Sequence, residues 1–208
     1  MAILLNKEYM KIITVISNLL SANTYIVYDE KSLDAVIIDA VQGFDRVNSV
    51  ISDLNLNVHA LLLTHGHFDH VWSAKKIQAK GIKVYIHKAD ADKLNTKKMY
   101  NFESLFADEY LNESLIKFGD IEVEVIFTPG HSKGGVCFLI ESLNAIFTGD
   151  TLFKDCIGRS DFPDSSEDDL INSVKNKLFT HRKDYIVYPG HGERTSIFFE
   201  KENNPYID

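Results

Sequence analysis

The sequence predicts a layered α/β or α+β domain. Short runs rich in β-branched and aromatic residues recur along the chain and are typical of strands, at residues 11–17, 24–28, 35–39, 58–63, 82–86, 121–127, 136–141, 144–148 and 184–188. Segments with helical spacing of apolar residues lie between some of these runs. Many short strands interspersed with helices favour sheets that are covered by helices.

Two amphipathic segments predict helices. One face of the first segment carries Phe44, Val47, Val50, Ile51 and Leu54. One face of the second segment carries Leu170, Ile171, Val174 and Leu178. The second segment opens with residues that cap a helix and complement its dipole, Ser165-Ser166-Glu167-Asp168-Asp169.

The predicted domain organisation is a single domain over residues 1–208. No linker rich in proline, glycine or serine divides the chain, and 208 residues suit one domain. Residues 88–118 show no clean period, so we expect helices and loops beside a site there.

Composition narrows the class of protein. The formal charge of −8, from 30 acidic and 22 basic side chains, argues against nucleic acid or anionic lipid as a partner. No apolar run approaches the roughly 18 residues of a membrane span, and the apolar residues at 12–16 are better explained by a strand than by a signal peptide. Cys137 and Cys156 are too few for a disulfide scaffold, so we expect a reducing, cytoplasmic compartment.

The densest group of histidines directly follows the strand predicted at 58–63. It reads His65-Gly66-His67-Phe68-Asp69-His70. Alternate residues of an extended segment point the same way, so His65 and His67 can converge on one metal ion while Asp69 and His70 turn toward a second. Imidazole and carboxylate ligands suit zinc, iron or manganese, whereas a structural zinc site more often uses cysteines.

Three more strand-ending turns carry a metal-ligand residue. They end in His131, Asp150 and His191, and each follows a predicted strand. Ligands at the ends of several strands can meet at one edge of a sheet. Asp150 is the natural bridge, since a carboxylate has two oxygens and partly neutralises two adjacent cations. We therefore predict two divalent metal ions per chain, zinc first, with iron or manganese as alternatives.

A pattern typical of serine hydrolases also occurs. Residues 130–134 match G-x-S-x-G around Ser132, but that nucleophile elbow requires a strand, a sharp turn and then a helix. Here the turn leads directly into the strand predicted at 136–141. We interpret Ser132 as a turn residue beside a metal ligand.

Taken together, these motifs resemble the metallo-β-lactamase superfamily, and within it the compact bacterial glyoxalase II-like (hydroxyacylglutathione hydrolase-like) proteins. The resemblance runs from about Met10 to Tyr206. Its most specific parts are His65-Gly66-His67-Phe68-Asp69-His70, Thr128-Pro129-Gly130-His131-Ser132, Gly149-Asp150-Thr151-Leu152-Phe153, Ile157-Gly158-Arg159-Ser160-Asp161 and Gly190-His191-Gly192.

The resemblance implies a four-layer αββα sandwich with the site at one edge of the paired sheets. It implies that residues 1–9 are an N-terminal extension and that the C-terminal helical domain of classical glyoxalase II is not part of this chain. It also implies the ligand sets: His65, His67 and His131 for the first ion, Asp69, His70 and His191 for the second, and Asp150 for both.

The predicted activity is hydrolysis of an acyl thioester such as S-lactoylglutathione. Two metal ions roughly 3.5 to 4 Å apart can deprotonate a bridging water and polarise the carbonyl that the resulting hydroxide attacks. A thiolate leaves without a general acid, which suits motifs that contain no obvious proton donor. Among the ligands we assign Asp69 and Asp150 as catalytic.

Substrate recognition is predicted from basic residues beside the ligand motifs. Lys133, Arg159 and Arg194 could form a positive rim for a small anionic thioester, although Arg159 could instead pair with an aspartate, for instance Asp161 or Asp164. Classical glyoxalase II binds the glutathione carboxylate with a lysine and a tyrosine where this chain has Arg159 and Asp161. The arginine could still bind a carboxylate, and the aspartate would repel one.

Other functions remain open. A persulfide dioxygenase-like oxygenase would use a single Fe(II) on the same scaffold, held by two histidines and one aspartate. Another hydrolase of the superfamily, such as a lactonase, or a non-catalytic metal-binding protein would also fit. A nuclease is disfavoured by the acidic charge. The sequence makes no prediction about the oligomeric state.

Overall fold

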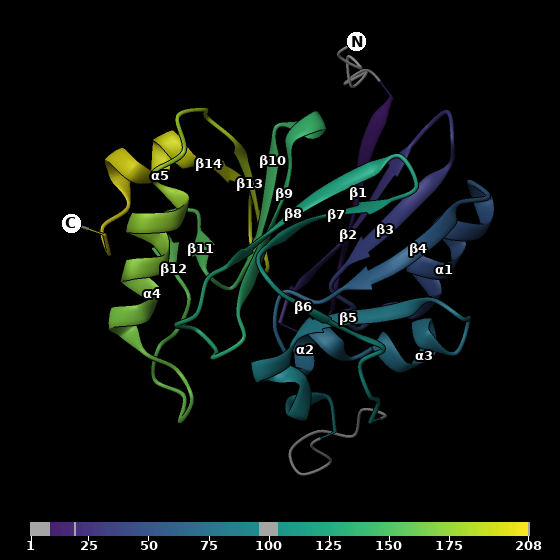
Figure 1. Cartoon of the computed structure of the whole chain (residues 1–208), viewed down its shortest axis with the longest axis horizontal. Helices are drawn as coiled ribbons and strands as arrows, with labels where there is room; N and C mark the ends of the chain where they lie inside the picture. The colour runs from purple at the N-terminus through teal and green to yellow at the C-terminus, as the bar shows by residue number, and fades with distance from the viewer. Residues whose placement is uncertain (1–8, 19, 96–103, 208) are drawn as a thin grey trace.

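The computed structural model describes residues 9–18, 20–95 and 104–207, which form two six-stranded sheets and a small hairpin (Figure 1). The first sheet has the order β1-β2-β3-β4-β5-β6, with strands β1 (Met10–Ile16), β2 (Asn23–Asp29), β3 (Asp34–Ile38), β4 (Asn57–Leu62), β5 (Lys83–His87) and β6 (Glu109–Leu111). The second has the order β14-β13-β10-β9-β8-β7, with strands β7 (Ser114–Phe118), β8 (Ile121–Phe127), β9 (Val136–Ile140), β10 (Ala145–Gly149), β13 (Ile186–Pro189) and β14 (Thr195–Ser196). The hairpin pairs β11 (Leu152–Phe153) with β12 (Cys156–Ile157).

Both sheets are mixed. In the first sheet, β3, β4, β5 and β6 run parallel, while β1 and β2 add antiparallel strands at one edge. In the second sheet, β7 to β10 form an antiparallel meander, and β13 lies parallel to β10. The strands β4, β8, β10 and β13 end at the same edge of the paired sheets (Figure 1).

Helices cover the outer face of each sheet, which confirms the four-layer αββα sandwich (Figure 1). The first sheet carries α1 (Phe44–Asp53), α2 (Phe68–Val71), α3 (Ala74–Gln78) and the 3₁₀ helix η1 (Lys88–Asn95). The second carries α4 (Glu167–Ser173), its π-helical continuation η3 (Val174–Leu178) and α5 (Ile197–Asn203). A short 3₁₀ turn, η2 (Glu141–Leu143), joins β9 to β10.

Three hydrophobic cores hold these layers together. The central core lies between the sheets, and two outer cores lie between each sheet and its helices. Strand β4 illustrates the arrangement: Ala60 and Leu62 face the central core, while Leu61 faces the helices. Because successive side chains of a strand point to opposite faces, a strand buried on both sides is apolar throughout, as β9 is.

The predicted strand runs all form strands, and both predicted helices exist. Ser166 caps α4, since its hydroxyl accepts a hydrogen bond from the backbone N–H of Asp169. Leu54, the last residue of the predicted face of α1, is the C-cap of the helix and is 38% exposed. Its backbone N–H still donates to the carbonyl of Val50, as in a helix.

Residues 88–118 differ from the prediction of helices and loops. They contain η1, as expected, but also the strands β6 and β7. Strand β6 has three residues and lies at a sheet edge, and β7 is mostly exposed, so neither has the apolar alternation of a buried strand. Residues 96–103 of this segment, and residues 1–8 of the expected extension, lie outside the described residues.

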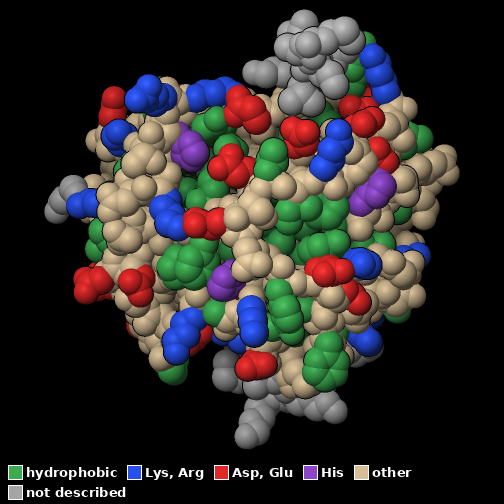
Figure 2. All heavy atoms as spheres, in the orientation of Figure 1, with side chains coloured by type: hydrophobic (Ala, Val, Ile, Leu, Met, Phe, Trp, Pro, Cys, Tyr) green, Lys and Arg blue, Asp and Glu red, His purple; other side chains and the backbone are tan. Residues whose placement is uncertain are grey.

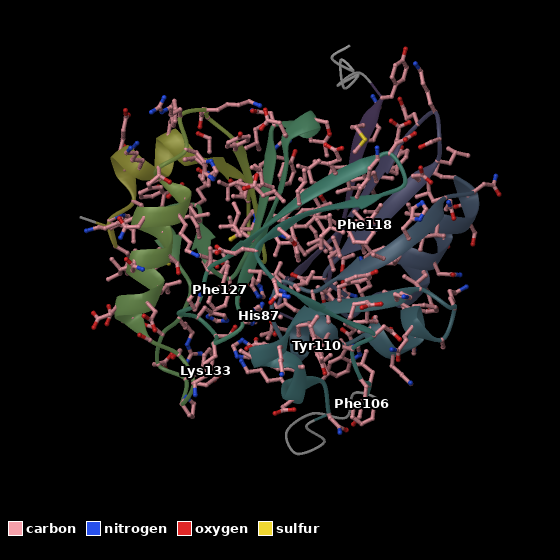
Figure 3. All side chains as sticks on the ribbon, viewed as in Figure 1. His87, Phe106, Tyr110, Phe118, Phe127 and Lys133 are labelled. Atoms are coloured by element: carbon pink, nitrogen blue, oxygen red, sulfur yellow. The ribbon has the colours of Figure 1, made fainter. Side chains whose placement is uncertain are left out.

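Acidic and basic side chains are intermingled over the face of the molecule seen in Figure 2, with hydrophobic side chains exposed between them. Phe106 and Tyr110, labelled in Figure 3, belong to these exposed hydrophobic side chains. Within the described part of the chain, no helix has the length and apolar character needed to cross a membrane.

Candidate metal centre

The predicted metal ligands meet at one edge of the sandwich. Each follows a strand: His65, His67, Asp69 and His70 come after β4, His131 after β8, Asp150 after β10 and His191 after β13. Among the described residues, the ligand atoms fall into three groups, and the atoms within each group lie within 4.8 Å of one another. The groups are His65/His67/His131, His65/His70/Asp150 and Asp69/His70/His191. The structure therefore brings every predicted donor to the same place.

The first group contains the three histidines predicted for one ion. Nδ1 of His67 lies 2.9 Å from Nε2 of His131, and the ring of His65 lies edge-on to both. Burial, and after it the neighbouring His131, lowers the pKa of His67 to about 4. His67 is therefore neutral near pH 7, the form in which imidazole binds a metal.

Asp150 lies between the first group and the second, which consists of Asp69, His70 and His191. Its Oδ1 is 3.3 Å from Nε2 of His70, and its Oδ2 is 3.5 Å from Nε2 of His131. The same Oδ2 also lies 3.6 Å from Nε2 of His191, so the carboxylate approaches donors of both groups. This is the placement that a bridging ligand requires.

Backbone carbonyls orient two of the rings. Nδ1 of His131 donates to the carbonyl of Arg159 at 2.8 Å, and Nδ1 of His191 donates to the carbonyl of Leu20 at 3.0 Å. A ring nitrogen that donates in this way leaves the other nitrogen as a lone-pair donor, here Nε2 facing the centre.

Asp39 orients two more rings, and the sequence analysis missed it. Its buried carboxylate accepts from Nδ1 of His70 at 2.9 Å and from the hydroxyl of Thr64 at 2.8 Å, and Thr64 in turn contacts Nδ1 of His65 at 3.0 Å. Asp39 follows the apolar strand β3 directly, as Asp150 follows β10. An acidic residue at the end of a buried strand was the signal that could have identified it.

The charges of the centre also suit a cation. Burial opposes the charged form of Asp150, yet His70 and His131 hold the pKa of this carboxyl far below its usual range. Burial likewise opposes a charge on His70, but Asp150 and Asp39 raise its pKa well above the usual value. Burial and the adjacent histidines lower the pKa of His65. The carboxylates of the centre therefore favour positive charge on the neighbouring groups, and a bound cation could supply that charge instead.

The residues present fit a divalent metal ion. Nε2 of His65 is buried and makes no hydrogen bond to any described residue. Such a nitrogen is costly to bury unless something binds its lone pair. Imidazole and carboxylate donors around an unpartnered lone pair are what zinc, iron or manganese would satisfy.

Helix α4 supports the loop that carries His131. The backbone N–H of Ser166 donates to the carbonyl of Gly130, and the hydroxyl of Ser173 donates to the carbonyl of Pro129. Gly130 has φ 140°, and a Cβ built there would lie 2.3 Å from the backbone of Leu170. The helix and the loop therefore touch at a point that only glycine fits.

Ser132 has the structural context expected from the sequence. It lies in the turn between β8 and β9, and a strand follows this turn where a nucleophile elbow would have a helix. Its side chain is buried, and its backbone carbonyl accepts from Gly130 and Gly135. The serine hydrolase interpretation is therefore excluded by topology.

The three residues of the predicted basic rim differ in their contacts. The guanidinium of Arg159 binds Asp161 through two hydrogen bonds of 2.8 and 2.7 Å, so the salt bridge considered as its alternative role is present. Lys133, labelled in Figure 3, and Arg194 are exposed on the loops after His131 and His191. Asp164, the other aspartate considered, binds Lys93 at 2.6 Å.

Aromatic rings pack beside the centre. Phe162, which the sequence analysis did not single out, lies 5.0 Å from the ring of His67 and 5.7 Å from that of His131. At the ends of β5 and β8, His87 stacks on Phe127 with ring centroids 4.5 Å apart, a contact that joins the two sheets (Figure 3). Of these rings, that of Phe162 packs directly against two imidazoles of the first group.

A four-layer αββα sandwich with histidine and aspartate donors at the shared sheet edge defines a class of metal-binding enzymes. The family model for the metallo-beta-lactamase superfamily matches residues 18–191, and the chain belongs to this superfamily. Its relatives include an uncharacterized protein of Mycobacterium tuberculosis, 35% identical over 92% of this chain and 95% of that protein. They also include hydroxyacylglutathione hydrolase GloC of Haemophilus influenzae, 32% identical over 89% of this chain and 92% of the relative.

Solved structures share the fold. The BLEG-1 B3 metallo-beta-lactamase has a TM-score of 0.89 and 27% identity, with 95% of this chain and 99% of that chain covered. TTHA1623 in a di-iron-bound form has a TM-score of 0.79 and 29% identity over 94% and 100% of the two chains. ETHE1 from Myxococcus xanthus has a TM-score of 0.78 and 27% identity over 94% and 84%. The chain thus resembles both a metallo-beta-lactamase and a protein solved with two bound iron ions.

Proposed function

We propose that this protein is a metal-dependent hydrolase that binds two divalent metal ions, zinc first, and cleaves acyl thioesters such as S-lactoylglutathione. The observation that carries the proposal is the position of Asp150, whose carboxylate lies within 3.6 Å of imidazole nitrogens of both donor groups. His65, His67 and His131 would hold one ion, Asp69, His70 and His191 the other, and Asp150 both. Divalent ions so placed lower the pKa of water and polarise a substrate carbonyl.

The chain's own residues prepare this chemistry. Asp39 and the carbonyls of Arg159 and Leu20 fix the direction in which the imidazoles present their lone pairs. Phe162 packs against the rings of His67 and His131. An apolar ring at this position would exclude water from one side of a bound substrate.

The choice of a thioester rests on the leaving group. Among the residues that the structure describes, Asp39 and Thr64 hydrogen-bond to the donors without being predicted donors themselves. Both are already bonded to each other and to imidazoles, so neither is available to protonate a leaving group. A thiolate needs no proton to leave, whereas an amine does. The likeness to GloC, whose name states hydroxyacylglutathione hydrolysis, supports the same choice.

A second candidate is the mononuclear iron oxygenase considered from the sequence. The likeness to ETHE1 over 94% of this chain is the observation that favours it. Three ligands, two histidines and one aspartate, would suffice for Fe(II). The two candidates therefore differ in metal count, in metal identity and in the need for oxygen.

The test combines metal analysis with an activity panel. We expect the purified protein to contain close to two zinc equivalents per chain and to hydrolyse S-lactoylglutathione without consuming oxygen. One iron per chain together with oxygen uptake on a persulfide would establish the second candidate instead. A lactone and a β-lactam in the same panel test the other hydrolytic activities of the superfamily.

Variants make the test specific to the site. His67→Ala and Asp150→Ala should each lower kcat/KM by at least about a hundredfold, as expected for loss of a ligand. His181→Ala, which removes a histidine outside the donor groups, is the matched control and should keep activity. Circular dichroism should show all three variants folded. Full activity of Asp150→Ala with one metal per chain would contradict a binuclear centre.

A further inference from the structure

One buried carboxylate beside the centre is not among the predicted donors. Asp90, in η1, has no exposed surface, and each of its oxygens accepts a backbone hydrogen bond. Oδ2 accepts from the N–H of Gly66 at 2.8 Å, and Oδ1 accepts from the N–H of Gly134 at 2.8 Å. Two separate loops are thus bound to a single side chain.

These two loops carry the first donor group. Gly66 lies between His65 and His67 on the loop that leaves β4, in the first sheet. Gly134 follows His131 on the loop that enters β9, in the second sheet. The carboxylate of Asp90 therefore links the two sheets where the first group requires them to lie at a fixed separation.

The backbones at Gly66 and Gly134 pack too closely against Asp90 to accommodate a larger residue. A Cβ built at Gly66 would lie 2.8 Å from the carbonyl oxygen of Asp90, and one built at Gly134 would lie 2.7 Å from its backbone nitrogen. Both loops therefore pack directly against residue 90. Such close approach transmits any change in the position of Asp90 to the histidines.

A third loop joins the same assembly through a lysine. Nζ of Lys93 lies 3.1 Å from Oδ1 of Asp90 and 2.6 Å from Oδ2 of Asp164. Asp164 belongs to the loop that places Phe162 over His67. The lysine offsets the cost of burying the Asp90 charge, which backbone hydrogen bonds alone would offset only in part.

We propose that Asp90 is a positioning residue for the first metal ion, setting the distance between the His65/His67 pair and His131. The inference rests on the proposed function only in requiring that these three histidines bind a metal ion. The second group is oriented by other residues, Asp39 and the carbonyl of Leu20. The effect of Asp90 is therefore selective for one ion of the two.

The test uses Asp90→Asn, which keeps the shape of the side chain. An amide has one acceptor oxygen and one NH₂ donor, so one of the two backbone N–H groups loses its acceptor and the pair with Lys93 loses its charge. The variant is combined with His191→Ala, which leaves the first group intact, and separately with His67→Ala, which leaves the second. Zinc dissociation constants are measured by competition with a chromophoric chelator.

We expect Asp90→Asn to weaken zinc binding about tenfold or more in the His191→Ala background, the effect typical of residues that orient metal ligands. In the His67→Ala background the change should be less than about twofold. Equal weakening in both backgrounds would show a general structural role and overturn the proposal. No weakening in the His191→Ala background would also overturn it.

Asp34→Asn is the matched control, since Asp34 also joins the two sheets but at their opposite edge. Its carboxylate accepts from the N–H of Asp120, in the turn between β7 and β8, and contacts His59. This variant should change thermal stability without changing either zinc dissociation constant.

Should Asp90→Asn fail to fold, Asp90→Glu is the second variant. It keeps the charge and adds one methylene, and the same selectivity for the first ion is expected. Wild-type protein that binds no zinc would contradict the proposed function itself, and this inference with it.

Discussion

The guanidinium of Arg159 has two competing uses beside the candidate centre. It forms a two-bond pair with Asp161 and lies 4.7 Å from the ring of Phe162. Asp161 holds the pKa of Arg159 above its usual value, and Arg159 lowers that of Asp161, although both side chains are largely exposed. Exposed ion pairs are weak, so a substrate carboxylate could displace Asp161.

This competition gives a prediction about binding. Asp161→Asn should free Arg159 and lower the KM for S-lactoylglutathione by about two- to fivefold with kcat unchanged, and Arg159→Met should raise KM by a similar factor. The measurement is steady-state kinetics of both variants. The lactoyl thioester of a small uncharged thiol is the control substrate, and its KM should not move. Equal shifts for the two substrates would show that the pair acts on the loop and not on the substrate.

At the scale of elements, the contact between α4 and the His131 loop predicts a large effect of a single methyl group. Gly130→Ala should destabilise the protein by about 2 kcal/mol or more, because its Cβ would meet the backbone of Leu170 and its φ of 140° strains any other residue. Gly81→Ala is the matched control: Gly81 also has a positive φ, but open space surrounds it. It should cost only about 1 kcal/mol.

Urea denaturation of both variants measures this difference. In addition, zinc affinity should fall for Gly130→Ala and stay unchanged for Gly81→Ala, since only the first displaces a loop with a donor. Equal destabilisation by the two substitutions would mean that strain in φ, and not contact with α4, sets the cost.

Elements also show how far the sequence can predict this fold. Strand β9 and the second half of β4 are buried on both faces, and their continuous apolar runs identify them from sequence alone. Strands β6 and β7 lack such a run because they lie at sheet edges, where pairing and not burial forms them. The register and order of the strands likewise depend on contacts between residues far apart in the chain.

In the candidate site, too, some residues could be predicted from the sequence and others could not. Its donors could be predicted because His and Asp at the ends of several strands have few structural explanations. Asp39 and Asp90 could not be assigned roles, since each acts through hydrogen bonds to loops that only the fold brings near. The pairing of Arg159 with Asp161 could be stated only as an alternative, because sequence spacing does not reveal which partner a flexible side chain selects.

At the scale of the whole molecule, the donor groups join the two sheets. His65, His67, Asp69 and His70 follow a strand of the first sheet, while His131, Asp150 and His191 follow strands of the second. A metal ion bound by both sets would bind the folded state and not the unfolded chain. Binding of this kind stabilises a protein in proportion to the logarithm of ligand concentration over Kd.

We therefore predict that chelation lowers the melting temperature. Zinc at about a hundred times its Kd contributes about 2.7 kcal/mol, so removal by EDTA should lower Tm by roughly 5–10 °C in a protein of this size. Differential scanning calorimetry before and after zinc is restored measures the shift. His67→Ala should show a smaller shift, and a wild-type Tm that does not respond to EDTA would contradict metal binding across the sheets.

The hydrogen bond from His191 to Leu20 bears on the biosynthesis of the protein. Its two partners are 171 positions apart, and Asn23 makes a second contact, to Pro189, over 166 positions. At elongation rates of about 5 to 20 residues per second, the early hairpin leaves the ribosome roughly 10 to 30 s before the histidine that it orients. The second donor group of a nascent chain therefore stays incomplete until His191 is available. A metal ion bound there as proposed would find its full set of ligands only at the end of synthesis, later than one bound by His65, His67 and His131.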